Sequence, residues 1–301
     1  MGKIVEKKIP VGVEETQDIV EKEFLGFPDI AEDVLNALLF GGKRVAEKEK
    51  LLAGPTESIY QGREKLRNQF EDLCMYEMAE GEVSLMYLLA NQSRTDGKML
   101  LRKAGYTGGI YRGQYEGRMG ETFPVIEVVL YWGKPRWKGS RTLRGLFRKK
   151  GICEDKWRYI DEMKLHVFEM RHLPEKTRRL FKSDMRIIAD FLAEGEKYCS
   201  DRKIVHKAAL IKMVKVLSGD MEIGGVESWL EEQGVREEDE VKVCELFDQY
   251  ERRGRKEGER LGESRLAKLI QMLIDGGRNE DVRRAAVDPV YREQLYVEAN
   301  L

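Results

Sequence analysis

The chain has 301 residues, with 53 Lys and Arg against 54 Asp and Glu, so its formal net charge is −1 although 36% of its residues are charged. This balance excludes a uniformly basic nucleic-acid binder and an acidic tail protein. The hydrophobic fraction of 42% excludes wholesale disorder, and no apolar run reaches the roughly 18 residues that a membrane helix needs. The first ten residues mix Lys and Glu without an apolar signal core, so we expect a cytoplasmic protein.

Four elements are predicted in the first half of the chain. Apolar residues at helical spacing predict a helix at 30–40, which ends before Gly41. Two short apolar runs, 70–76 and 83–89, are separated by a turn at Gly81 and favour a pair of strands. The segment after this hairpin contains Leu100, Leu101 and Tyr111 but also four glycines, each of which weakens a helix by about 1 kcal/mol; we predict a helix there.

The next elements are clearer. Residues 124–132 are rich in β-branched and aromatic side chains and predict a strand, and a second strand is predicted at 163–170. Helical patterns follow at 182–192 and 204–217. A helix, a strand pair, a helix and two further strands predict an α/β domain with a mixed sheet.

The C-terminal third has a different pattern. Helical spacing from 240 to 274 is interrupted by a charged, glycine-spaced stretch at 252–262, which we expect to be a hinge. Residues 279–301 predict two helices that meet at Asp288-Pro289, because Pro disfavours helix in the residue before it. We therefore expect an α/β domain at 1–200 and a helical region at 201–301, whose helices are a candidate surface for homo-oligomer formation.

The four cysteines are far apart and form no CxxC pair, and the three histidines show no metal-ligand spacing. We therefore expect neither a zinc knuckle nor a disulfide framework. Each cysteine is expected to be a small buried apolar side chain. They are Cys74, Cys153, Cys199 and Cys244.

The charges are sorted along the chain. Residues 134–186 contain 17 Lys and Arg against 7 acids, whereas residues 220–250 contain 2 against 11. The basic block opens with a run that contains no acid and is interleaved with Trp137 and Phe147, a composition suited to phosphate contacts with occasional stacking. A solvated loop paired with acidic neighbours is the alternative. The predicted DNA-binding residues are Lys134, Arg136, Lys138, Arg141, Arg144, Arg148, Lys149 and Lys150.

Several short motifs follow one another along nearly the whole chain. They are DVLNALLFGGK at 33–43, EDLCMY at 71–76, NQS at 91–93, MLLR at 99–102, VLYWG at 129–133, FKSDMR at 181–186 and DPVYREQLY at 288–296. In this order they resemble the Rpn family of recombination-promoting nucleases, also called YhgA-like transposases, within the PD-(D/E)XK nuclease fold. The resemblance implies a restriction-endonuclease-like mixed sheet flanked by helices and followed by a helical C-terminal region.

The chemistry that the resemblance implies is Mg²⁺-dependent hydrolysis of phosphodiesters in double-stranded DNA. Mg²⁺ is held by one or two carboxylates together with waters and substrate phosphate, and it activates a water for attack. In this fold an Asp begins one strand of a hairpin, and an acid-x-Lys or, in this family, acid-x-Gln sequence ends the next strand. Two neighbouring strand tips thus bring the catalytic groups to one metal ion.

Asp72 matches the first position of that motif and is the predicted catalytic residue and metal ligand. Gln92 matches the position of the catalytic Lys and is expected to orient a water or a phosphate. The acid between them is replaced by Ala90, whose methyl group cannot ligate Mg²⁺. Asp33 matches a family acid on the first helix and is the second candidate ligand. Two further acids stay open as ligands: Glu77 and Asp96.

Each of these residues also has a simpler interpretation: Asp72 as an ordinary strand-end acid, Asp33 as an exposed helix residue and Gln92 as part of a turn.

Three functions of the protein are compatible with these interpretations. The first is an active DNA endonuclease that promotes recombination, impaired to the extent that Ala90 matters. The second is a nuclease-fold protein that binds DNA without cutting it, and the third is a scaffold for protein interactions.

Overall fold

The computed structural model describes residues 11–54, 57–58, 69–70, 73–117, 120, 122–147, 151–195, 198–219, 226–236, 239–244 and 262–299. Its contacts divide the chain into two compact units, Met1–Glu240 and Val241–Leu301. The sequence-based boundary at 200 therefore differs from the observed one by 40 residues. The reason is that helix α8 (Lys207–Ser218) packs against helix α1 (Val11–Leu25), which brings the residues after 200 into the first unit.

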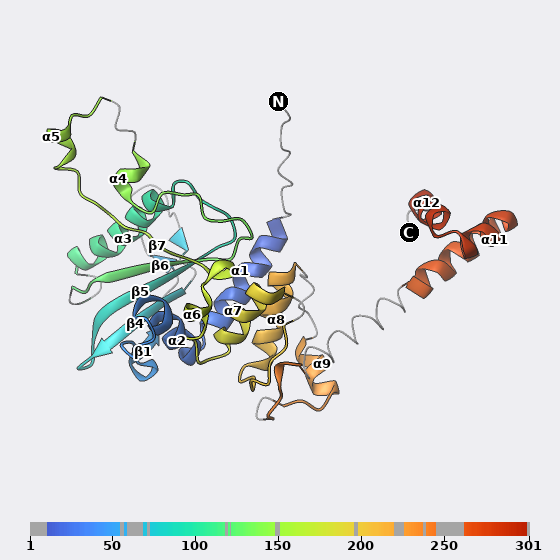
Figure 1. The fold of residues 1–301 in the computed structure, drawn as a ribbon, viewed down its shortest axis with the longest axis horizontal. Coiled ribbons are helices and arrows are strands. Elements are labelled where there is room, and N and C mark those ends of the chain that lie inside the picture. The colour runs from blue at the N-terminus through green and yellow to red at the C-terminus, as the bar shows by residue number, and fades with distance from the viewer. Residues whose placement is uncertain are drawn as a thin grey trace. The chain divides into compact units, whose positions relative to one another are not determined.

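The first unit contains a five-stranded mixed sheet with the strand order β1-β4-β5-β6-β7 (Figure 1). Strand β4 is antiparallel to its neighbours β1 and β5, whereas β5, β6 and β7 run parallel to one another. Two short strands form a separate pair. The strands are β1 (Leu51–Ala53), β2 (Glu57–Ser58), β3 (Gln69–Phe70), β4 (Leu73–Ala79), β5 (Glu82–Gln92), β6 (Val125–Tyr131) and β7 (His166–Glu169). The predicted α/β class with a mixed sheet is confirmed.

The predicted strand pair is confirmed as the β4–β5 hairpin, which is longer than its apolar runs. Its turn consists of Glu80 and Gly81, with φ of 54° and 88°. Positive φ at both central residues gives a turn whose twist matches that of the flanking strands. Glu80 takes up a conformation that is uncommon for a residue with a side chain.

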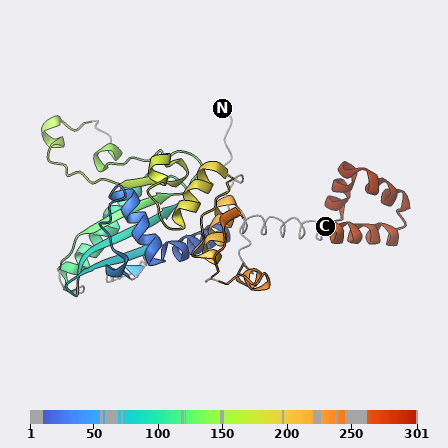
Figure 2. The ribbon, with the colours of Figure 1, turned by 60° about the horizontal axis from the view of Figure 1, so that its bottom comes forward.

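Helices cover both faces of the sheet. Helix α3 (Met99–Tyr115) lies on one face, and helices α2 (Pro28–Leu39) and α7 (Met185–Glu194) lie on the other (Figure 1, Figure 2). Pro28 begins α2 at a position where a missing N–H costs nothing. The predicted helices at 30–40, 182–192 and 204–217 are confirmed as α2, α7 and α8.

The remaining helices of the first unit are short. Helix α1 and strand β1 were not predicted, and the strand predicted at 163–170 is limited to β7. The short helices are η1 (Lys48–Lys50), α4 (Leu143–Leu146), α5 (Glu154–Trp157), η2 (Met170–His172), α6 (Glu175–Arg178) and α9 (Val226–Glu232).

Helix α3 forms although it contains four glycines. At Gly108 an added Cβ would have no heavy atom within 4 Å, and the residue lies inside a regular helix. Gly108→Ala should therefore raise the free energy of unfolding by about 0.5–1 kcal/mol, because Ala restricts the unfolded chain and fits the helix. Chemical denaturation measures this gain.

Gly81→Ala is the matched control for that substitution. A Cβ at Gly81 also meets nothing within 4 Å, but its φ is +88°, which an L side chain rarely adopts. The same change should therefore lower the free energy of unfolding by about 1 kcal/mol at Gly81. Destabilisation by Gly108→Ala together with stabilisation by Gly81→Ala would contradict the assigned backbone conformations. No change in stability in either variant would contradict them too.

The second unit is a small group of helices. Helical residues 262–275 are followed by α11 (Asn279–Val287) and α12 (Pro289–Glu298), which confirms the predicted pair with its break at Asp288-Pro289. Except for Gly262, the predicted hinge at 252–262 lies outside the described residues. The apolar core of this unit consists of Leu269, Leu273, Ala285, Leu295 and Tyr296.

The cysteines only partly follow the prediction. Cys74 is buried as expected, but Cys153 is exposed. Cys199 is exposed as well, so the expectation that every cysteine is a small buried side chain is wrong. In the described part of the chain, no helix combines the length and apolar character needed to span a bilayer.

Candidate functional site

The parallel strands β5, β6 and β7 end at the same edge of the sheet. The register pairs Gln92 with Tyr131, and Tyr131 with Glu169. The Trp132 N–H donates to the Gln92 carbonyl oxygen at 2.8 Å, so the segment after β6 starts beside the end of β5. In α/β proteins the carboxyl ends of parallel strands are the usual position of a ligand site. We call this region the carboxyl edge.

Four exposed cations follow β6 at the carboxyl edge: Lys134, Arg136, Lys138 and Arg141. We call this set the edge basic surface. It adjoins the segment that follows β5, since the Lys138 N–H lies 3.5 Å from Thr95 Oγ1. The other predicted DNA-binding residues differ from these four. Arg144 is only partly exposed and its Nε donates to the Ile160 carbonyl at 2.7 Å, and Arg148, Lys149 and Lys150 lie outside the described residues.

Glu169, at the end of β7, organises two of these cations. Its carboxylate accepts the backbone N–H of Trp137 at 3.0 Å and a guanidinium N–H of Arg141 at 2.9 Å. Arg136 Nη1 lies 3.7 Å from the carboxylate oxygen Oε2. The two arginines are therefore partly neutralised and held in place. Within the described residues no ion pair joins Lys134 or Lys138 to an acid, so their charge is available to a ligand.

The two aromatic residues of the basic run have different environments. Trp137 is buried and packs edge-on against Tyr131, with ring centroids 5.2 Å apart. It therefore belongs to the core, and the prediction that it stacks on a nucleic acid is wrong. Phe147 is exposed, as that prediction requires.

Ala90 lies in an apolar environment. Its side chain is buried in a cluster between the sheet and α3, on the face that α3 covers. The members of this cluster are Ala90, Met99, Leu100, Val129, Tyr131, Trp137, Leu165 and Val167. A methyl group suits these surroundings, whereas a carboxylate there would need a cation to offset its burial.

Gln92 is the last residue of β5 and is partly exposed at the carboxyl edge. Its Nε2 donates to the Asn91 carbonyl at 2.5 Å. Asp72, the other predicted catalytic residue, lies outside the described residues. In the chain it precedes Leu73, which pairs with Leu89 across the hairpin.

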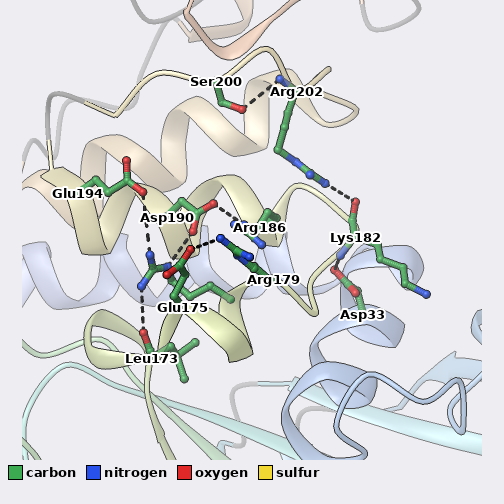
Figure 3. A network of polar contacts seen from close by, with 11 residues as sticks. Asp33, Leu173, Glu175, Arg179, Lys182, Arg186, Asp190, Glu194, Ser200 and Arg202 are labelled. Carbon is green, nitrogen blue, oxygen red and sulfur yellow. Dashed lines mark hydrogen bonds and ion pairs between the residues drawn. The ribbon is translucent and has the colours of Figure 1, made fainter.

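Asp33 lies on α2, which covers the face of the sheet opposite to Ala90. It is 8% exposed, and its Oδ2 accepts the Lys182 N–H at 2.8 Å, the Ser183 N–H at 2.8 Å and the Ser183 hydroxyl at 2.7 Å. Figure 3 shows this junction, where Arg202 also donates to the Lys182 carbonyl. The structure therefore does not bring Asp33 to Gln92.

The two acids that the sequence left open are also engaged. Glu77 accepts the Tyr87 hydroxyl at 2.8 Å, and Asp96 accepts the Lys98 N–H at 2.8 Å. No group of three or more His, Cys, Asp or Glu side chains that could hold a metal ion occurs among the residues that the structure describes. Because Asp72 lies outside the described residues, the Mg²⁺ site stays a prediction.

A buried carboxylate was missed by the sequence analysis. Glu127 on β6 is 0% exposed, and its Oε2 lies 3.9 Å from Lys103 Nζ on α3. Burial raises the pKa of Glu127 above its ordinary value of 4.5, and the attraction of Lys103 and Arg102 offsets this only partly. Glu127 lies within an otherwise apolar strand, and no local sequence pattern marks it.

Glu127 should make stability depend on pH. Because its pKa is raised, the Glu127 carboxyl group holds its proton more tightly in the folded protein than in the unfolded chain. The contribution of Glu127 to the free energy of unfolding therefore falls as pH rises from 4.5 through the raised pKa. Glu127→Gln should remove that fall, which amounts to about 1.4 kcal/mol for each unit by which the pKa is raised. Denaturation of both proteins from pH 4 to pH 8 measures it. Glu82→Gln, at an exposed site on β5, should match the wild-type profile.

The family model described as "Putative transposase, YhgA-like" matches residues 15–216, a range that contains the whole sheet and both helical layers. No curated protein and no solved structure matches the chain.

Proposed function

Because the chain belongs to the YhgA-like transposase family, we propose that it is a nuclease-fold protein that binds double-stranded DNA at the edge basic surface and whose cleavage site is impaired at Ala90. The observation that carries the proposal is the position of Lys134, Arg136, Lys138 and Arg141 at the carboxyl edge, beside the end of β5. DNA bound there would pass directly over Gln92.

The chemistry of these four side chains suits a phosphate backbone. Arg136 and Arg141 present planar guanidinium groups oriented by Glu169, and such groups bind phosphate oxygens in pairs. Lys134 and Lys138 supply point charges that replace condensed counterions on DNA. The formal net charge of −1 does not oppose this binding, because the field at a surface depends on local charges.

The cleavage part of the proposal depends on the β4–β5 hairpin. The PD-(D/E)XK motif requires an acid before one hairpin strand and an acid-x-Gln sequence at the end of the next. The chain has Asp72 before β4 and Gln92 at the end of β5, with Ala90 at the position of the second acid. One carboxylate of the expected set is therefore absent, and Ala90 is packed among apolar groups.

Plasmid nicking with Mg²⁺ or Mn²⁺ tests this proposal. We expect wild type to bind DNA with a steep salt dependence and to nick little, and Ala90→Glu to nick more. Asp72→Ala in the Ala90→Glu background should abolish the gain. A carboxylate in this apolar cluster costs stability, so the midpoint of thermal unfolding of Ala90→Glu is measured first. Mg²⁺ should raise the midpoint of Ala90→Glu more than it raises the midpoint of wild type.

A fully active, recombination-promoting endonuclease is the second candidate, and the presence of Gln92 at the end of β5 favours it. Wild type would then nick DNA as fast as Ala90→Glu, and Asp72→Ala alone would abolish nicking. If wild type fails to bind DNA even at low salt, the DNA-binding proposal is wrong and a scaffold role follows.

A further inference from the structure

The loop that carries the edge basic surface, residues 132–141, is fixed by the segment that follows β7. Arg171 Nε donates to the Trp132 carbonyl at 2.7 Å, and His172 Nε2 lies 2.9 Å from the Lys134 carbonyl oxygen. Both contacts hold the backbone of the loop. The start of the loop is therefore fixed without any contribution from the acid that ends β7.

That acid, Glu169, lies among the donors that a bound phosphate would need. The backbone N–H of Trp137 donates to Oε2 at 3.0 Å, and Arg141 Nη2 donates to Oε1 at 2.9 Å. Arg136 Nη1 lies 3.7 Å from Oε2. Arginine side chains and backbone N–H groups are among the usual donors to phosphate oxygens in protein–DNA complexes. The carboxyl edge therefore contains an anion site that the carboxylate of the chain itself occupies.

The two arginines are engaged to different degrees. Both terminal nitrogens of Arg141 donate within the protein, Nη2 to Glu169 and Nη1 to the Val167 carbonyl at 2.7 Å, whereas the Arg136 contact exceeds hydrogen-bond distance. The Glu169 side chain is 16% exposed, but those of Arg141 and Arg136 are 46% and 67% exposed. An ion pair whose cation is this exposed is weak. A phosphate that reaches Arg141 from solvent can therefore replace Glu169.

We infer that Glu169 restrains DNA binding, because it occupies the phosphate-binding groups of Arg141 and competes for them with the DNA backbone. Lys134, Arg136 and Lys138 contact phosphates directly, and Arg141 adds its contact only when the carboxylate is displaced. Affinity differences within one interface lie mostly in the dissociation rate, so Glu169 shortens the time that the protein spends on a duplex. This inference rests on the proposed DNA binding and adds the regulation of that surface to it.

The test measures the affinity of the full chain for one DNA duplex over a range of salt concentrations. Glu169→Gln removes the charge but keeps an oxygen that can accept the Trp137 N–H. Its affinity at 0.1 M salt should exceed that of wild type by about eightfold, and its slope of log K against log salt should be steeper by about 0.9, the contributions of one phosphate contact. The double variant Glu169→Gln with Arg141→Gln loses the ion pair as a whole, and its affinity and slope should return to the wild-type values.

Glu162 provides a matched control within the same basic block of the sequence. It is exposed, and it accepts the backbone N–H of Arg144 at 3.1 Å. Glu162 precedes β7, however, whereas Glu169 ends it, so only Glu169 lies at the carboxyl edge. Glu162→Gln removes the same charge and should leave both the affinity and the salt slope unchanged.

Four outcomes contradict the inference and leave the proposed DNA binding intact. If the affinity of Glu169→Gln is unchanged or lower, Glu169 only orients the arginines. If Glu162→Gln binds more tightly by the same factor, the gain reflects general charge. If the double variant keeps the gain, Arg141 is not the group that Glu169 occupies. Loss of the folded state in Glu169→Gln, seen as an absent thermal transition, shows that the carboxylate is needed for structure. Failure of wild type to bind the duplex at low salt removes the proposed function, and the inference with it.

Discussion

Replacing Lys134 and Lys138 together by Ala should weaken binding to duplex DNA by about 50-fold at 0.1 M salt, if each lysine neutralises one phosphate. These two lysines are chosen because they are exposed and because the arginines beside them are bound to Glu169. Removal of Arg141 would also disturb a structural contact with the Val167 carbonyl. The lysine variant changes charge without touching the core.

The salt dependence gives the sharper measurement. The slope of log K against log salt should become shallower by about 1.8 in the double variant, since each phosphate contact contributes about 0.9. The control is the pair Lys43→Ala and Lys48→Ala, two exposed lysines between α2 and β1. It should leave affinity and slope unchanged. If both pairs lower the affinity equally, binding reflects general charge and the edge basic surface is not the site.

The strongest local patterns of the sequence gave correct elements, for reasons that the structure makes clear. Strand β6 is buried along most of its length, and such a strand is apolar at nearly every position; Glu127 is the exception. The β4–β5 hairpin is marked by its Gly81 turn. Helix α3 was predicted against its glycines, and it forms because tertiary contacts of Met99, Leu100 and Ile110 with the sheet outweigh weak helix propensity.

Other elements could not be predicted because they depend on distant partners. Helix α1 buries Val20, Phe24 and Leu25 near its end, and what defines it is its packing against α8, nearly two hundred positions later in the chain. Strand β1 has three residues and exists because β4 is there to pair with it. Such elements have no periodic pattern long enough to identify them.

The candidate site was predicted in composition but not in arrangement. The exposed cations after β6 could be read from the sequence, whereas the burial of Trp137 could not, because it depends on Tyr131 and Glu169. Asp33 shows the same limit. Its place in a family motif suggested a metal ligand. The sequence does not reveal that residues 182–183 lie beside α2 and that their backbone N–H groups donate to the Asp33 carboxylate. The role of Asp33 is therefore the second large prediction.

Asp33→Ala should lower the free energy of unfolding by about 3 kcal/mol, because it leaves three donors of Lys182 and Ser183 without their acceptor in a partly buried junction. Asp33→Asn should cost less, since an amide oxygen can still accept. Glu32→Ala, on the same helix and bonded to the exposed Arg44, should cost under about 1 kcal/mol.

Mg²⁺ separates this structural role from the predicted ligand role. If Asp33 only joins α2 to the segment before α7, titration with Mg²⁺ changes the stability of wild type and Asp33→Ala equally. If Asp33 binds the ion, Mg²⁺ stabilises wild type alone, and the difference between the two proteins grows with its concentration. The structure favours the first result, because Asp33 Oδ2 already accepts three hydrogen bonds and because α2 covers the face of the sheet opposite to α3, whose residues pack against Ala90.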